Sequence, residues 1–211
     1  MTRGKKNRRL LWIVPAAIGI FGGLIVTLIA AWQCRALLNP KNWFVDEHGY
    51  DAEIGAAAKK HRLDPELVRA LIYQESRFKA NRRGSHGEIG LMQVLPSGAA
   101  AEWARVNKRR RPYNWELFDV ELNLEIGCWY LARALNRWKD YRHGTELALA
   151  QYNAGEKRAR DWAPKAKNGE VLPRVKIAST KKYITEIMKR YRSYARDTGG
   201  VEKPKTVTGK R

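Results

Sequence analysis

Residues 64–76 read Asp-Pro-Glu-Leu-Val-Arg-Ala-Leu-Ile-Tyr-Gln-Glu-Ser. The stretch opens with helix-start signals: Asp64 can cap free backbone N–H groups, Pro65 suits the first turn, and the acid Glu66 favours the helix dipole. The positions that share one helix face by the i, i+3, i+4, i+7 spacing are Val68, Leu71, Ile72 and Glu75. The sequence therefore predicts an amphipathic helix whose apolar face carries a carboxylate at its end.

Glu75 is the first candidate for chemistry. Burial on an apolar face disfavours the charged carboxylate and raises its pKa, which is what a general acid needs near neutral pH. The alternative is a helix-end acid paired with Arg77 or Arg82 and without a chemical role. Periodicity alone leaves both interpretations open.

Helical patterns continue on the C-terminal side. Ser97 is predicted to open a short helix through residues 99–106, and a long helix is predicted to end at Gly144. Thr145 can cap the next helix, which Gly155 should terminate. The apolar stripes that predict the long helix and the last helix are Leu124, Cys128, Leu131, Leu135, Trp138 and Ile184, Ile187, Met188, Tyr191.

Strand patterns are scarce, with residues 89–95 as the one short candidate. Residues 198–211 combine Gly, Lys, Pro and Thr without aromatic residues, which predicts a flexible basic tail. We therefore expect one mostly helical domain over residues 51–197.

Composition excludes several classes of site. The chain of 211 residues is 44% hydrophobic, enough for a core, and has only two cysteines and four histidines. There is no Cys-x-x-Cys or His-x-x-x-His spacing, so we predict neither a metal site nor a cofactor. The Gly84-x-x-Gly87-x-x-Gly90 spacing lacks the leading Gly-x-Gly of a dinucleotide site.

A membrane anchor is predicted at residues 10–32. This run carries no charge and, as a helix, would be about 34 Å long, against about 30 Å for the hydrocarbon core. Trp12 and Trp32 stand at its ends, and residues 1–9 are basic, which predicts a cytoplasmic N-terminus and an exported remainder. Residues 33–50 are expected to form a tether.

Two other interpretations of this segment are a cleavable signal peptide and a lipoprotein signal ending at Cys34. Both need small residues where Trp32 and Gln33 stand, which favours the uncleaved anchor. Gly19-x-x-x-Gly23 could pack two such helices, but the spacing alone gives this little weight. Cys34 and Cys128 could form a disulfide in an oxidising compartment, although two separate thiols are favoured.

Three motifs follow one another in a fixed order: Glu75-Ser76, then Gly90-Leu91-Met92-Gln93, then Tyr152-Asn153-Ala154-Gly155. Subsidiary matches are Asn123-x-x-x-Gly127-x-x-Tyr130-Leu131 and Thr180-x-x-Tyr183. Together they make residues 56–195 resemble the catalytic domain of the soluble lytic transglycosylases, which belong to the lysozyme-like superfamily. This resemblance implies a helical lysozyme-like domain with a substrate cleft.

The resemblance also implies an activity. Such enzymes cleave peptidoglycan between N-acetylmuramic acid and N-acetylglucosamine and leave a 1,6-anhydro end without consuming water. By match to the motif, Glu75 is the catalytic residue, first as acid and then as base. With the predicted anchor and its basic flank, we expect this domain on the outer side of a bacterial inner membrane, with further envelope partners unspecified.

The substrate-binding residues implied by the resemblance are Ser85, Met92, Gln93, Tyr152, Asn153 and Tyr183. Gln93 would hold the sugar by hydrogen bonds, and the Tyr152 hydroxyl would reach the acid. Plainer interpretations stay open for Met92 as a core residue, Asn153 as a turn residue and Tyr183 as the apolar start of a helix. Ser85 only adjoins the family's serine position.

Two rival functions differ in whether they need a second carboxylate or need Glu75 at all. A hydrolytic muramidase on the same fold would use a second carboxylate, with Glu88 the nearest candidate in sequence. A glycan-binding scaffold of a cell-envelope machine would not need the acid at all.

The formal net charge of +20 raises the question of which partner the basic residues bind. Lys108-Arg109-Arg110-Arg111 is the densest basic run and is predicted to lie in a loop. A nucleic-acid partner is disfavoured because the domain is expected outside the cytoplasm and no recognition helix carries the run. Anionic wall polymer, stem-peptide carboxylates and lipid head groups are better candidate partners for this run. The alternative is a solvated basic surface without a specific partner.

Overall fold

The computed structural model describes residues 45–197, and these residues are mostly helical. The helices are α2 (Asp51–His61), α3 (Pro65–Ser76), α4 (Ala101–Val106), α5 (Val120–Arg137), α6 (Gly144–Ala154), α7 (Glu156–Trp162) and α8 (Ala178–Asp197). A π-helical turn, η2 (Pro96–Ala100), precedes α4, and the 3-10 turns η3 (Glu116–Phe118) and η4 (Leu172–Arg174) precede α5 and α8.

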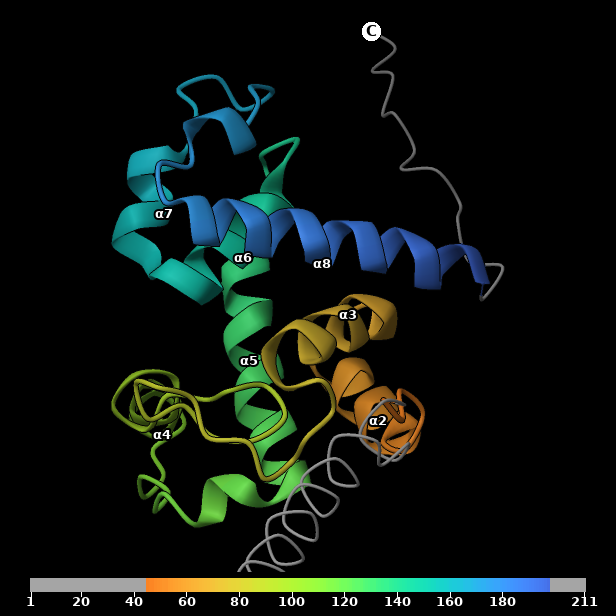
Figure 1. Cartoon of the computed structure of the whole chain (residues 1–211). Coiled ribbons are helices and arrows are strands. Elements are labelled where there is room, and N and C mark those ends of the chain that lie inside the picture. The colour runs from red at the N-terminus through yellow and green to blue at the C-terminus, as the bar shows by residue number, and fades with distance from the viewer. Residues whose placement is uncertain (1–44, 198–211) are drawn as a thin grey trace, which may run out of the picture. The chain divides into compact units, whose positions relative to one another are not determined.

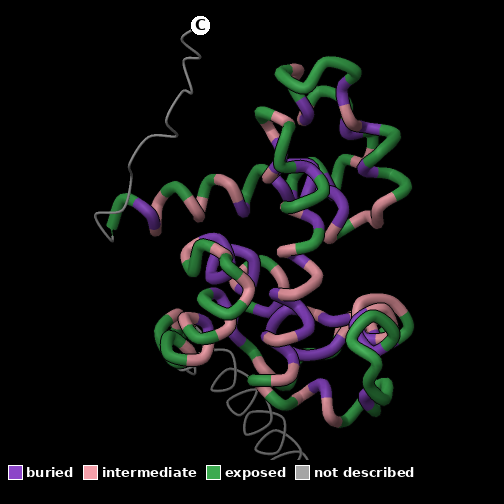
Figure 2. The backbone as a smooth tube through the Cα atoms, turned by 180° about the vertical axis from the view of Figure 1, so that it is seen from behind, coloured by how far each residue is buried: buried purple, intermediate pink, exposed green. Residues whose placement is uncertain are grey.

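Helix α5 runs through the middle of the domain (Figure 1). It packs against α2 and α6, while α8 lies across α3 and α6. Its own buried residues include Leu124, Ile126 and Leu131, each at most 1% exposed. Buried residues gather where the helices face one another, and exposed residues dominate the connecting segments (Figure 2).

Helix α3 begins as the sequence predicts. The Asp64 side chain accepts a hydrogen bond from the Glu66 N–H at 2.9 Å, and Pro65 occupies the first turn. Val68, Leu71 and Ile72 are fully buried, which confirms the apolar face. Helix α3 ends at Ser76, and Arg77 and Phe78 follow with φ of 50° and 58°. Two successive left-handed residues turn the chain sharply just after Glu75.

Several predicted boundaries are wrong. The long helix α5 ends at Arg137, and Gly144 starts α6 instead of closing α5. His143, not Thr145, is the residue before α6, and it provides no side-chain cap. Residues 89–95, the short strand candidate, make a hairpin-like turn and no ladder: Ile89 and Val94 form an isolated antiparallel bridge with reciprocal hydrogen bonds of 3.1 and 2.9 Å, and Ile89 also bridges Arg83. Gly155 does end α6.

The predicted anchor, residues 10–32, and the tail, residues 198–211, lie outside the described residues, as does Cys34. Within residues 45–197, no helix combines the length and the apolar character needed to cross a bilayer. The predicted last helix is present as α8, which also contains Thr180 and Tyr183.

Candidate active site

Glu75 lies in the last turn of α3, partly buried, with its carboxylate against α8. The Tyr183 hydroxyl donates a hydrogen bond to Glu75 Oε1 at 2.5 Å. Neither Arg77 nor Arg82 forms an ion pair with this carboxylate among the described residues. The tyrosine contact, and not a surface ion pair, therefore holds the acid in place.

The electrostatics of Glu75 suit an acid that works near neutral pH. Burial raises its pKa to about 7, and the nearby charge of Glu88 adds to the rise. The Tyr183 hydrogen bond and the charge of Arg82 act in the opposite direction, because both favour the carboxylate. Burial wins, so Glu75 holds a proton for a large fraction of molecules at pH 7.

Tyr183 is the residue that reaches the acid, and Tyr152 is not. The Tyr152 hydroxyl instead donates to the Met92 backbone carbonyl at 3.0 Å. Burial, with the nearby Glu75 charge, raises the pKa of each tyrosine well above its usual value. Both hydroxyls thus remain protonated donors. The predicted Tyr152–acid contact is corrected to a Tyr183–acid contact, because Tyr183 lies on α8 directly over the end of α3.

Asn153 ties α6 to α8. Its side-chain Oδ1 accepts a hydrogen bond from the Thr180 hydroxyl at 2.8 Å, and the Asn153 residue itself is exposed. The bond links two of the recognised motifs, since Thr180 stands one turn before Tyr183 on α8. Asn153 thereby helps to set where the Tyr183 hydroxyl lies.

The loop between α3 and η2 is fastened to α5 by a single side chain. Asn123 accepts a hydrogen bond from the Met92 N–H at 2.9 Å and donates to the Ile89 and Leu117 carbonyls, each at 2.8 Å. Asn123 is 1% exposed, so these bonds are shielded from water. One buried amide therefore positions the loop that carries Gln93.

Gly90 is required where this loop meets Asn123. Its φ is +81°, and a Cβ at this position would stand 2.2 Å from Asn123 Nδ2 and 2.8 Å from the Leu117 carbonyl oxygen. Gly127 on α5 is likewise closed to larger residues, because a Cβ there would lie 2.4 Å from Met92 Sδ. The glycines of both motifs are explained by close packing.

Met92 is a core residue. It is fully buried, packed over Gly127, and accepts a weak hydrogen bond from the Cys128 thiol at 3.8 Å between the sulfurs. Burial raises the pKa of Cys128 to about 12, so this thiol stays protonated. With no exposed surface, Met92 supports the site from behind, and its predicted contact with sugar is replaced by packing.

Gln93 is half-buried and adopts φ of 48°, in the left-handed region. Its side-chain Nε2 donates to the Gly90 carbonyl at 2.8 Å and to the Arg82 carbonyl at 3.3 Å. Both amide hydrogens are thus used inside the loop. Only Oε1 remains without a hydrogen-bond partner among the described residues, so Gln93 can offer a ligand an acceptor but no donor.

Ser85 and Glu88 belong to the exposed arc of the same loop. Ser85 is exposed, and its hydroxyl lies 3.2 Å from His86 Nδ1. The Glu88 carboxylate turns back over the loop, where Oε2 accepts from the His86 N–H at 3.0 Å. The Glu88 side chain is 27% exposed, so it is partly shielded although it lies on this arc.

The other candidate carboxylates are placed elsewhere. Asp119 caps α5 by accepting from the Leu122 N–H at 2.9 Å. Glu125 pairs with Lys60 at 2.8 Å and His61 at 2.9 Å on α2. No cluster of three or more His, Cys, Asp or Glu side chains within residues 45–197 is arranged to hold a metal ion.

Comparisons with known proteins agree with this geometry. Residues 53–172 match the family described as Transglycosylase SLT domain. A membrane-bound lytic murein transglycosylase E from Buchnera aphidicola is 33% identical over 100 residues, which are 44% of this chain and 45% of the relative. A membrane-bound lytic murein transglycosylase F from Desulfosudis oleivorans is 36% identical over 118 residues, covering 54% and 24% of the two chains. The matched segments span less than half of each relative.

Solved structures show the same fold. The lytic transglycosylase Slt of Pseudomonas aeruginosa superposes with a TM-score of 0.64 at 24% identity, over 74% of this chain and 25% of that one. The 70 kDa soluble lytic transglycosylase of Escherichia coli superposes with a TM-score of 0.64 at 22% identity, over 72% and 25%. With helices, loop and acid arranged in this way and the family matched over most of the domain, the chain belongs to the Transglycosylase SLT domain family.

Proposed function

We propose that this protein is a lytic transglycosylase that cleaves the β-1,4 bond between N-acetylmuramic acid and N-acetylglucosamine in peptidoglycan. The observation that carries the proposal is Glu75: a partly buried carboxyl with a pKa of about 7, held by Tyr183 at the family's acid position. The curated relatives bear the name lytic murein transglycosylase.

The reaction needs one group that first gives and then takes a proton. The Glu75 carboxyl donates its proton to the glycosidic oxygen as the bond to the muramic acid C1 breaks. The C6 hydroxyl of the same sugar then attacks C1, and the Glu75 carboxylate takes the hydroxyl proton. A 1,6-anhydro ring closes, Glu75 is protonated again, and no water enters.

Tyr183 serves both halves of this cycle. Its hydroxyl donates to the carboxylate that forms when Glu75 loses its proton, and the same hydrogen bond keeps Oε1 fixed. Gln93 Oε1 can accept a hydrogen bond from the sugar. Ser85, on the exposed arc, and Asn153, through its exposed residue surface, are further proposed contacts.

The proposal includes a place in the cell. We expect residues 10–32 to anchor the chain in the inner membrane, with the SLT domain on the outer side facing the wall. The uncharged run with its basic N-terminal flank supports this. So do the names of the curated relatives, which describe membrane-bound enzymes.

A hydrolytic muramidase is the second candidate, because the Glu88 charge lies close enough to raise the Glu75 pKa. The retaining and inverting glycosidases pair two carboxylates across the scissile bond. Here the Glu88 carboxylate is engaged by the His86 N–H of its own turn. This engagement favours the one-acid mechanism.

Mass spectrometry of digested wall separates the candidates. Purified sacculi are incubated with the detergent-solubilised full chain and with its Glu75→Gln variant, which keeps the side-chain volume but has no proton to give. Muramic acid ends one water lighter than hydrolysed ends, absent with the variant, are expected. Reducing ends of full mass would replace the proposal with hydrolysis, and glycan retained without cleavage would indicate a scaffold.

A further inference from the structure

A second groove lies between α2, the end of α4 and α5. It has a volume of about 1090 Å³, and none of Glu75, Gln93 or Tyr183 lines it. Glu125 and Trp129 on α5 face this groove. They are on a different side of the helix from Asn123 and Gly127, which support the loop that carries Gln93. The groove is therefore separate from the candidate active site.

The groove continues into an adjoining hollow of about 630 Å³ lined by the basic run. Trp103, Asn107, Arg109 and Leu122 line both spaces, which makes them one continuous depression. Lys108 and Arg110 belong to the hollow. The Lys108–Arg111 run that the catalytic proposal leaves unused thus borders a concave site.

Two tryptophans give the groove an aromatic wall. Trp103 is 8% exposed, and its indole Nε1 is a buried donor without a hydrogen-bond partner among the described residues. Buried indole N–H groups ordinarily find an acceptor, and this one has none among the described residues. Trp129 is half-buried, and the Arg133 guanidinium lies 4.8 Å from its ring centroid. Indole faces are suited to packing against sugar rings.

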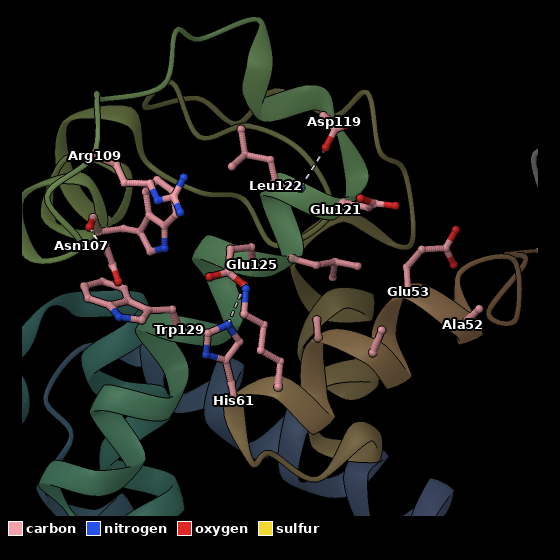
Figure 3. Close-up of a pocket in the computed structure, with 15 residues that line it drawn as sticks. Ala52, Glu53, His61, Asn107, Arg109, Asp119, Glu121, Leu122, Glu125 and Trp129 are labelled. Carbon is pink, nitrogen blue, oxygen red and sulfur yellow. Dashed lines mark hydrogen bonds and ion pairs between the residues drawn. The ribbon is translucent and has the colours of Figure 1, made fainter.

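Charge is divided along the groove. Arg109, Asn107 and Trp129 stand at one end, while Glu53 stands at the other (Figure 3). Glu125 in the middle is already satisfied by Lys60 and His61, whose hydrogen bonds outweigh burial and lower its pKa. Asp119 Oδ1 already accepts from the Leu122 N–H, which leaves Asp119 Oδ2 and the Glu121 carboxylate able to accept hydrogen bonds from hydroxyl groups.

We propose that this groove is a second peptidoglycan-binding site that takes a disaccharide with its acidic stem peptide. The neutral N-acetylated sugars pack on Trp129 and donate hydroxyl hydrogens to Asp119 and Glu121, and the peptide carboxylates meet Arg109 and Lys108. The inference rests on the proposed function, since it assumes that the chain works on wall. It deepens that function by letting the enzyme hold one strand while it cuts another.

Retention on insoluble sacculi tests the site in the full chain with Glu75→Gln, so that glycan is bound but not cut. Trp129→Ala removes the aromatic surface, and Arg109→Glu reverses the charge at an exposed residue. Each is expected to weaken retention about fivefold to tenfold. Lys189→Glu, at an exposed position on α8, changes net charge equally and is expected to change nothing.

A folding control uses the same groove changes with Glu75 intact. Cleavage of a short soluble peptide-free glycan, which needs only the catalytic site, is expected to stay at the parent rate. If Trp129→Ala lowers the rate of this cleavage, that change disturbs more than the groove, and the retention of Arg109→Glu alone tests the inference. Equal retention of parent and Arg109→Glu overturns the inference even when anhydro product is formed. If the protein with Glu75 intact forms no anhydro product and the groove variants still lose retention on sacculi, only the proposed reaction is refuted.

Discussion

Removing the Tyr183 hydroxyl should move the pH dependence of cleavage upward. This hydroxyl donates to Glu75 Oε1 at 2.5 Å and favours the carboxylate over the acid. A hydrogen bond to a charged group contributes about 1.5–3 kcal/mol and one to a neutral group about 0.5–1.5 kcal/mol, so the difference is about 1–1.5 kcal/mol. Since 1.36 kcal/mol corresponds to one pH unit, Tyr183→Phe should shift the alkaline limb by about one unit.

The sign follows from which form loses its partner. In Tyr183→Phe the carboxylate is destabilised, the pKa of Glu75 rises above its starting value of about 7, and the acid form persists to higher pH. The rate at the optimum should fall as well, because the carboxylate that must form in the reaction is no longer stabilised.

The assay measures kcat/KM for release of anhydro ends from sacculi between pH 5 and 10, with the Glu75 carboxyl carbon followed by ¹³C NMR as an independent titration. Tyr152→Phe is the matched control, because its hydroxyl donates to the Met92 carbonyl and not to Glu75. An alkaline limb that stays in place or moves down in Tyr183→Phe, or that moves equally in Tyr152→Phe, would refute the reasoning.

Three further changes test other parts of the site. Glu75→Gln should abolish cleavage and yet raise the free energy of unfolding by about 3 kcal/mol at pH 8 but not at pH 4. A carboxyl whose pKa is raised from 4.5 to about 7 costs stability as pH rises through that range, and urea unfolding at the two pH values checks this. Glu88→Gln should lower the pKa of Glu75 by removing a like charge and shift the alkaline limb down while cleavage persists; loss of all cleavage would assign Glu88 a chemical role. Asn123→Ala should lower the free energy of unfolding by about 2–4 kcal/mol, because it strands a buried N–H and two carbonyls, and thermal denaturation that matches the parent would contradict this.

Local signals in the sequence predicted the start of α3, the buried face that ends at Glu75 and the end of α6 at Gly155. In each case the deciding interaction lies within a few residues, as in the Asp64 cap on the Glu66 N–H. The short α7 was missed, since seven residues of which five are charged, EKRARDW, show no apolar stripe and the helix depends on Ala159 and Trp162 being buried. Helix propensity over so short a stretch is weak.

The hydrogen bonds within the site were harder to predict than the identity of its residues. Tyr183 bonds to an acid that is 108 positions away in sequence, and only the crossing of α8 over α3 brings them together. Asn123 was identified only as a subsidiary match, although two of its hydrogen bonds hold the loop that carries Gln93 and a third ties it to Leu117 in η3. That Tyr183 and not Tyr152 bonds to Glu75 likewise depends on how the helices pack, which cannot be predicted from the spacing of residues in the sequence.

The fastening of the loop by Asn123 has a consequence for how this family can vary. Residues 89–92 are pinned at both ends by one amide, so an inserted residue there would pull Gln93 out of position. The arc at residues 84–88 lies outside the pinned stretch and meets solvent at Ser85 and His86. Lengthening that arc would leave the Asn123 bonds intact. Variation in loop length should therefore arise at the arc, while the pinned stretch keeps its length.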